Sequence, residues 1–505
     1  MRVFKTITQR PDRISRLTRT SLVAILFAFC SATTPAKACD QLAAGSLFWV
    51  RLTASLSSYT AKPGMPVQGF LLKSPECDNA PVLSAKIPVE GRVLSVHRVG
   101  LGLWHETAAL EIAFTRLLPQ SGSPIEINGR VKLIDNARET VRKGVIRGIR
   151  STDTPQGRIT SRLKYLPSVH LYPDPFLLGY KMLFPIFPEP EINLQPGTDI
   201  EVELIQTASL PAGLPAVARI PAMNQDAELT ARLTALPMRT FTKKGKEADV
   251  VNVAFIASRN DLEQAFQAAG WQPSDPVSTH AVVHGMYAFL AKTNFSTAPM
   301  SLQLLDGRKP DLTFEKALQT SEKRNHLRIW QADSSDGTPL WVGAAVHETG
   351  ATLSIKHKGF IHHVSEDLSE EQQAVMQDLF VAGCVDAAGS VARPGMDHIM
   401  PNATGEFFRT DGSVEVIRLK PCTSAPTEIT SANAPPFKAG SRAFRYVRRE
   451  VLTVRSDLWR ANCIYSAFDL TRMTVAALRR NSSHRAEQIS EKTAANTAHP
   501  PQTTP

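Results

Sequence analysis

Hydrophobic residues in the first third of the chain come in short runs separated by turn-forming Gly, Pro, Ser and Asn. These runs lie at residues 47–50, 67–71, 91–96, 108–114, 125–131 and 200–205. Many short runs with turn chemistry between them predict a β-sandwich or a barrel-like domain. We place this domain at residues 39–207. It includes an excursion at 149–196 whose Pro and aromatic residues do not fit a regular sheet.

The pattern changes near residue 249 to a strand followed by a helix. Residues 250–257 predict a buried strand, and Ser258 with Asp261 predicts a capping box for the next helix. Leu262, Phe266 and Ala269 would form the inner stripe of that helix, which Gly270 ends. Several strands follow, so the fold class is α+β, with a β-rich domain before a mixed domain. We assign 208–248 to a linker, 249–480 to the second domain and 481–505 to a disordered tail.

Two more helices are predicted in the second domain. Ser369 and Gln372 predict a capping box for the first. The second begins near Ser441, is rich in arginine, and has a predicted buried stripe of Val447, Val451, Val454 and Leu458. Its arginines can contact anionic lipid head groups, although a solvated basic face is the alternative.

Residues 1–38 have the pattern of an export signal. A basic segment runs to Arg19, an apolar run follows from Leu22 to Cys30, and Ala36 and Ala38 are small residues before Cys39. The apolar run is shorter than the roughly 20 residues that a membrane-spanning helix needs. We therefore predict export with cleavage before Cys39, to a periplasmic or extracellular location. The alternative is an uncleaved segment that anchors the protein to the inner membrane.

Charge and cysteine content follow from this signal. The formal net charge is +10, but residues 1–38 carry seven basic residues and one acidic residue, which leaves 50 basic and 46 acidic residues in the body. A charge of +4 on a body of this size predicts no nucleic-acid partner. Export makes disulfides possible, and Cys39 with Cys77 is one predicted bridge. Two of Cys384, Cys422 and Cys463 can form another, and the sequence does not choose which.

Several segments in the second half of the chain, in the same order along the sequence, resemble the LssY-like C-terminal domain family. They are residues 251–255, 268–272, 307–311, 323–330, 340–344, 362–363, 402–405 and 410–412. The resemblance spans about residues 249–475, and the family is associated by name with type I secretion. Asn325 stands where family members commonly carry a second His before His326. The β-rich domain loosely resembles domains of envelope-spanning secretion channels, to which we attach no residue roles.

The candidate site lies on the stretch from Lys323 to Trp330. In a strand, alternation puts His326, Arg328 and Trp330 on one face, and Leu327 and Ile329 on the other. A predicted hairpin at 306–311 brings Arg308 beside this face. We predict that Arg308, Arg324, His326 and Arg328 converge on an exposed pocket and bind a phosphate or carboxylate. Solvated charges around a small core are the alternative.

A second group of polar residues can complete a site: Asp311, His347, His362, His363 and Asp367. His362 and His363 are adjacent, so in a strand they point to opposite faces and cannot both enter one metal site. We predict no metal site, and the sequence identifies no cofactor and no catalytic residue.

Two functions remain from the sequence. The first is a noncatalytic envelope protein, secretion-associated or membrane-associated, that recognises an anionic ligand, a membrane surface or other envelope proteins. The second is a hydrolase that acts on phosphoesters with His326 and a carboxylate such as Asp311 or Asp367. The absence of a Gly-x-Ser-x-Gly elbow, a P-loop and a His-Glu-x-x-His pair favours the first.

Overall fold

A computed structural model describes residues 39–461 except 78–79, 102–106, 151–187, 224–226, 319, 321, 333–338, 355–358 and 424–439, and a few positions of 467–478. The predicted export signal, most of the Pro-rich excursion and the predicted tail lie outside the described residues.

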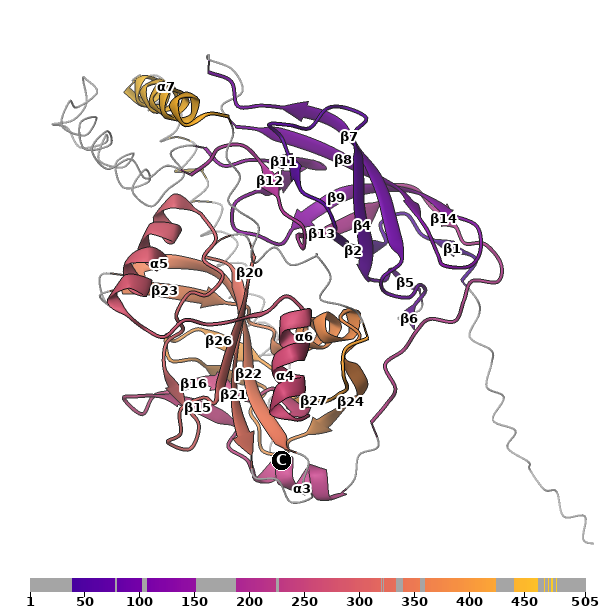
Figure 1. The fold of residues 1–505 in the computed structure, drawn as a ribbon, viewed down its shortest axis with the longest axis vertical. Helices are drawn as coiled ribbons and strands as arrows, with labels where there is room; N and C mark the ends of the chain where they lie inside the picture. The colour runs from indigo at the N-terminus through magenta and orange to yellow at the C-terminus, as the bar shows by residue number, and fades with distance from the viewer. Residues whose placement is uncertain are drawn as a thin grey trace, which may run out of the picture. The chain divides into compact units, whose positions relative to one another are not determined.

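The first domain is a closed six-stranded antiparallel barrel, which confirms the barrel-like alternative (Figure 1). Its strands follow the order β8 (Ala109–Leu117), β7 (Pro88–His97), β4 (Pro66–Lys73), β2 (Leu47–Leu52), β13 (Asp199–Leu204) and β9 (Ile125–Ile134). Pairing of β8 with β9 closes the barrel. In β9 every second residue from Ile125 to Val131 is buried, so alternation fills the interior.

Short strands complete this domain. The hairpin β10 (Thr140–Arg142) and β11 (Val145–Arg147) adds to β8. Two-stranded pairs form from β1 (Gln41–Leu42) with β14 (Ala208–Ser209), β3 (Leu56–Ser57) with β12 (Asn193–Leu194), and β5 (Glu76–Cys77) with β6 (Ala80–Pro81).

The second domain is built on a mixed sheet, as predicted. Its order is β18 (Gln272–Pro273), β20 (Leu312–Ala317), β21 (Arg324–Ala332), β22 (Leu340–Ser354), β17 (Val253–Ile256), β27 (Ser413–Leu419) and β24 (Val385–Ala392). β23 (Gly359–Val364) also pairs with β22. The β17–β27 pair is parallel and the other pairs are antiparallel.

The two faces of this sheet have separate cores. Helices α4 (Arg259–Ala268) and α6 (Leu368–Val381) lie on one face (Figure 1). Their residues Phe266, Val375 and Leu379 pack with Leu327 and Ile329 of the sheet. On the other face, Trp330 packs with Ala254 and with Leu233 of α3 (Ala227–Ala235).

Smaller elements complete the second domain. A small sheet has the order β16 (Glu247–Val250), β15 (Arg239–Thr242) and β19 (Gln303–Leu304). Therefore α3 and β15 lie within residues 208–248, the stretch that we assigned to a linker, and β16 begins in it. The remaining elements are α5 (Thr279–Ala291), α7 (Arg442–Ala461), and the pair β25 (Ile399–Pro401) with β26 (Phe407–Arg409).

Local predictions for the second domain hold in part. Ser258 caps α4 as predicted: its Oγ accepts a hydrogen bond from the Asp261 backbone N–H at 3.1 Å. The predicted strand at 250–257 is instead interrupted at Asn252. The amide of that residue bonds to both the backbone N–H and the carbonyl oxygen of Ala345. The cap of α6 is Asp367 and not Ser369.

The stripe predicted for α7 is wrong at its described positions. Val447 is 57% exposed and Val451 is 36% exposed, whereas Arg448, Leu452 and Arg455 are buried. The Arg448 guanidinium lies 2.7 Å from Glu189 and 3.4 Å from Glu191. Ion pairing therefore decides which side of the helix is buried. The spacing of apolar residues does not indicate such ion pairs.

Disulfides fit the predicted use of cysteine. Cys384 and Cys422 form one disulfide, and Cys39 and Cys77 are also disulfide-bonded. Disulfides are typical of proteins in oxidising compartments outside the cytoplasm. Within the described residues, no helix combines the length and apolar character required to cross a membrane.

Candidate functional site

Strand β21 carries the candidate residues and lies between β20 and β22. Its alternation is as predicted: Leu327 and Ile329 contribute to the core under α4 and α6, and Trp330 contributes to the opposite core. Arg324, His326 and Arg328 share the Trp330 face because they lie at every second position.

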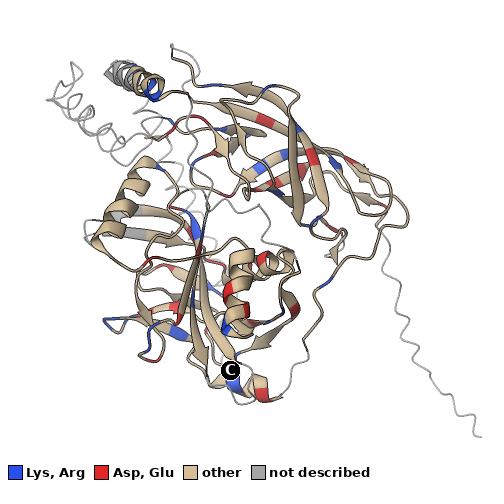
Figure 2. Ribbon diagram, in the orientation of Figure 1, with Lys and Arg blue, Asp and Glu red and all other residues tan. Residues whose placement is uncertain are grey.

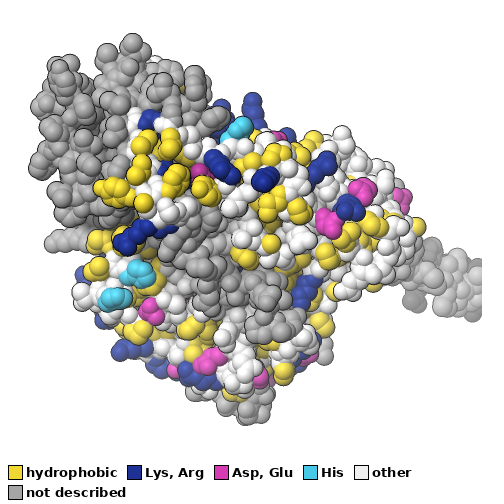
Figure 3. Space-filling view, turned by 45° about the horizontal axis from the view of Figure 1, so that its top comes forward, with side chains coloured by type: hydrophobic (Ala, Val, Ile, Leu, Met, Phe, Trp, Pro, Cys, Tyr) yellow, Lys and Arg dark blue, Asp and Glu magenta, His cyan; other side chains and the backbone are white. Residues whose placement is uncertain are grey.

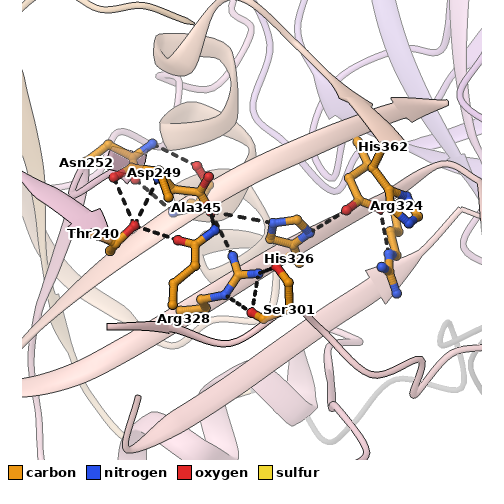
Figure 4. A network of polar contacts seen from close by, with 12 residues as sticks. Thr240, Asp249, Asn252, Ser301, Arg324, His326, Arg328, Ala345 and His362 are labelled. Atoms are coloured by element: carbon orange, nitrogen blue, oxygen red, sulfur yellow. Dashed lines mark hydrogen bonds and ion pairs between the residues drawn. The ribbon is translucent and has the colours of Figure 1, made fainter. Parts of the chain in front are cut away.

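The face that holds the three cations is buried. Arg324 and His326 are each 5% exposed, and Arg328 is 2% exposed. The prediction of an exposed pocket is therefore wrong at these three residues. The physical reason is that neighbouring strands and loops place carboxylates and carbonyl oxygens against each cation (Figure 4). Anion binding by these residues stays a prediction.

Arg324 is held by two glutamates on flanking strands. Its Nε donates to Glu348 Oε2 of β22 at 2.7 Å, and its Nη1 donates to Glu315 Oε2 of β20 at 2.9 Å. Arg324 is opposite Glu348 in the register of β21 and β22, so the ladder itself brings the two together.

His326 and His362 both approach the carboxylate of Glu348. His326 Nδ1 lies 3.2 Å from Glu348 Oε1, and His362 Nδ1 of β23 lies 3.0 Å from Glu348 Oε2. The other ring nitrogen of His326 lies 4.0 Å from Asp249 Oδ2. His326 thus links a carboxylate of β22 to one of β16.

Arg328 ends the network at Asp249 and Ser301 (Figure 4). Its Nη1 donates to Asp249 Oδ2 at 2.8 Å, and its Nε and Nη2 donate to the Ser301 carbonyl oxygen at 3.2 and 3.0 Å. Gln303 Nε2 also donates to Asp249 Oδ2 at 2.8 Å, and Thr240 Oγ1 donates to the side-chain oxygen Oε1 of Gln303 at 2.5 Å. The Asp249 backbone N–H also donates to Thr240 Oγ1 at 2.9 Å, so Asp249 has partners on two strands of the small sheet, β15 and β19.

The electrostatics of this network follow from burial and from neighbouring charge. Burial would raise the pKa of Glu348, but Arg324, His362 and His326 hold that pKa well below its ordinary value. Burial lowers the pKa of His326, which favours the neutral imidazole. Burial raises the pKa of Glu315 to about 8, against the opposing charge of Arg324. The Arg324 guanidinium therefore faces the ionised carboxylate of Glu348, and the Arg328 guanidinium faces the side chain of Asp249.

The opposite face of the sheet holds a second polar group. His347 Nδ1 lies 2.6 Å from the Asn325 side-chain oxygen and 3.9 Å from Glu371 Oε2 of α6. Burial, with the negative charges of Asp378 and Asp135, raises the pKa of Glu371 well above its ordinary value. His347 therefore belongs to a different site from His326, although both were candidates for one polar site.

Asp378 of α6 lies close to Glu371 in this second group. Its carboxylate accepts hydrogen bonds from Trp271 Nε1 at 3.0 Å, from Lys316 Nζ at 2.7 Å and from Arg51 Nη2 at 2.9 Å. Burial opposes ionisation, but Lys316 and Arg51 lower the pKa of Asp378 below its ordinary value.

The remaining candidates lie outside the buried network. Arg308 is exposed and donates to the Gln331 carbonyl oxygen at 3.1 Å. The turn at Leu305–Arg308 forms as predicted, but β19 pairs with β15 and β20 pairs with β21, so the two strands make no hairpin.

The other predicted carboxylates and the second histidine of the adjacent pair have local roles. The Asp311 carboxylate accepts from the Gln331 backbone N–H at 2.8 Å, and Asp367 caps α6. His363 Nδ1 lies 2.6 Å from Glu406, so the adjacent histidines do point to different partners, as alternation predicts.

Sequence reasoning missed every carboxylate of the network: Asp249, Glu315 and Glu348. Each lies within or beside an apolar run, and a charged residue there is a signal that a buried partner exists.

The arrangement is suited to holding charged groups in fixed positions. Within the part of the chain that the structure describes, no group of three or more His, Cys, Asp or Glu side chains has the geometry to hold a metal ion. Both nitrogens of His326 face carboxylates, and neither Asp311 nor Asp367 is among the partners of its ring.

The second domain is therefore an α+β domain with a mixed sheet and a buried ion-pair network on one face. Residues 233–414 match the family model described as LssY C-terminus, so this part of the chain is similar to that domain family. The match confirms the predicted family, over a shorter span than the 249–475 that we expected.

Two further comparisons concern curated proteins and solved structures. No curated protein matches this sequence. Among solved structures, ComB10 of the Com type IV secretion system of Helicobacter pylori is similar: the alignment has 11% identity and a TM-score of 0.20, and covers 35% of this chain and 93% of ComB10. At this TM-score we base no conclusion on the similarity.

Proposed function

We propose that this protein is a noncatalytic binding protein of the cell envelope that docks on an anionic membrane surface through α7. The observation that carries the proposal is the exposed apolar side of this helix. On this side Phe444 is 40%, Val447 is 57% and Val451 is 36% exposed, at positions i, i+3 and i+7. Contiguous exposed apolar side chains mark surfaces that interact with proteins or membranes.

The basic residues of α7 supply the second component. Arg442 is exposed and Arg445 is partly exposed, whereas Arg448 and Arg455 are buried and hold the helix by contacts with Glu189 and the Gly100 carbonyl oxygen. A helix with exposed aromatic and aliphatic groups and adjacent arginines is typical of attachment at the lipid interface. Both signs of charge are otherwise interspersed along the chain (Figure 2), and the face drawn in Figure 3 also carries basic and acidic side chains.

The predicted export signal and the disulfides support an envelope location for this function. The hydrolase alternative lacks a comparable observation, because Asp311 and Asp367 bond to backbone N–H groups away from His326.

Vesicle binding tests the proposal. We expect co-sedimentation of the purified mature chain with phosphatidylcholine vesicles that contain phosphatidylglycerol, and weaker co-sedimentation with phosphatidylcholine alone. The variant Arg442→Gln/Arg445→Gln should bind the anionic vesicles about 30-fold more weakly, since each basic residue near such a surface contributes about 1 kcal/mol. Val447→Glu should bind more weakly to both vesicle types.

Matched controls place the same changes elsewhere. Arg418 is an exposed arginine of β27, and Ile399 is a 61% exposed residue of β25. Arg418→Gln and Ile399→Glu should leave vesicle binding unchanged. Equal binding by the α7 variants and the parent would refute attachment through this helix.

A further inference from the structure

Helix α5 carries two histidines one turn apart that have no role in the proposed membrane attachment. His280 and His284 are at positions i and i+4, and both side chains are exposed. Their ring centroids are 6.3 Å apart. Residues at this spacing lie on the same side of a helix. Because no helix was predicted at these residues, the sequence did not indicate that the two histidines lie side by side.

The helix holds the pair on a fixed support. Ser278 caps α5 by accepting a hydrogen bond from the Ala281 backbone N–H at 3.1 Å, and Ala281 and Ala288 are buried against the domain. The His284 ring also packs on Phe295, with 4.3 Å between ring centroids. This contact limits the rotation of His284, whereas His280 lies in the exposed first turn.

The spacing suits chelation by imidazole nitrogen. A metal–nitrogen bond of about 2 Å places the ring centroid roughly 3 Å from the ion, so two imidazoles on one ion have centroids about 4.5–6 Å apart. The observed 6.3 Å is slightly wider, and a small rotation of His280 closes the difference. Within the part of the chain that the structure describes, neither imidazole makes a hydrogen bond that would compete with a metal ion.

We propose that His280 and His284 form a surface site for a divalent late transition metal. Imidazole is a ligand for Zn²⁺, Cu²⁺ and Ni²⁺, and affinity follows the order in which Cu²⁺ exceeds Ni²⁺ and Zn²⁺. Two protein ligands leave the other coordination positions to water, so the ion is exchangeable and its open positions can accept an anion or another side chain. This site goes beyond the proposed membrane attachment, which uses α7.

Cu²⁺ titration of the untagged mature chain tests the site, with electron paramagnetic resonance to report nitrogen coordination. The matched variant is Val282→His/His284→Ala. It keeps the number of histidines but moves the second imidazole to i+2, which lies on a different side of the helix. Because Val282 is 49% exposed, the change does not disturb the core. We expect binding at this site to weaken about 100-fold through loss of the linked second ligand.

A second variant restores the geometry. In Val283→His/His284→Ala the two imidazoles are at i and i+3, a spacing that also puts them side by side, and we expect tight Cu²⁺ binding to return. Equal Cu²⁺ affinity of the i+2 variant and the parent would overturn the proposal, as would failure of the i+3 variant to bind more tightly than the i+2 variant. Circular dichroism confirms that each variant keeps the parent fold.

Discussion

Removal of Arg328 should destabilise the second domain strongly, because it leaves the Asp249 carboxylate buried with only part of its partners. Asp249 is 7% exposed, and Arg328 lies 2.8 Å from it. The substitution Arg328→Met keeps much of the side-chain volume and removes the charge. Loss of one partner from a buried ion pair costs about 3–5 kcal/mol.

The double variant Asp249→Asn/Arg328→Met separates this effect from lost packing. It removes both charges and keeps the hydrogen bond from Gln303 available to an amide oxygen. A buried pair that is replaced as a whole is often close to neutral in stability, so we expect the double variant to recover about 2 kcal/mol or more of the loss.

Thermal unfolding followed by tryptophan fluorescence measures the effect, since Trp271, Trp330 and Trp341 are buried in this domain. A loss of about 3–5 kcal/mol corresponds to a melting temperature lower by about 6–20 °C for a domain of this size. The control Arg418→Met alters an exposed arginine of β27 and should change stability by less than about 0.5 kcal/mol. A single variant that melts like this control, or a double variant that recovers nothing, would refute the ion-pair argument.

Three further predictions concern pH, disulfides and anions. Because burial raises the pKa of Glu315 to about 8, the folded state binds a proton that the unfolded state has released between about pH 4.5 and 8, so stability should fall as pH rises through this window. Urea unfolding at several pH values gives the decrease in the free energy of unfolding per pH unit. This decrease should be smaller in Glu315→Gln by up to about 1.4 kcal/mol per pH unit, and the same decrease in both proteins would contradict the raised pKa. The variant Cys384→Ser/Cys422→Ser opens a loop with a sequence separation of 38 residues, and should lose about 4 kcal/mol in thermal unfolding in the chain-entropy model; an unchanged stability would show that this disulfide does not constrain the chain. For the predicted anion site, phosphate at constant ionic strength should raise the melting temperature, and Arg308→Gln should reduce that response because Arg308 is the exposed member of the four; an equal response in both would exclude Arg308 from the site.

Much of the architecture could be predicted from the sequence because it rests on local patterns. The alternation in β21 and the capping of α4 by Ser258 depend on residues within one element. The six strands of the barrel could be recognised as short runs, but the closure of β8 onto β9 depends on pairing across the whole domain. Helix α5 was missed because its apolar residues surround the helix and show no single stripe, with Val282, Val283 and Met286 exposed.

Only the cations of the candidate site could be predicted from the sequence. Arg324, His326 and Arg328 lie in one run of the sequence, so alternation predicts their common face, but their partners come from residues 249, 301, 315 and 348 on other elements. A set of cations with no recognised carboxylate nearby predicts an anion site. The same set with a carboxylate opposite each guanidinium forms a buried network without net charge. The sequence does contain the deciding signal, because Glu348 and Asp249 adjoin apolar runs where an unpaired carboxylate would be unstable. Register then selects the pair: once β21 and β22 are antiparallel with Ile329 opposite Gly343, Arg324 must lie opposite Glu348.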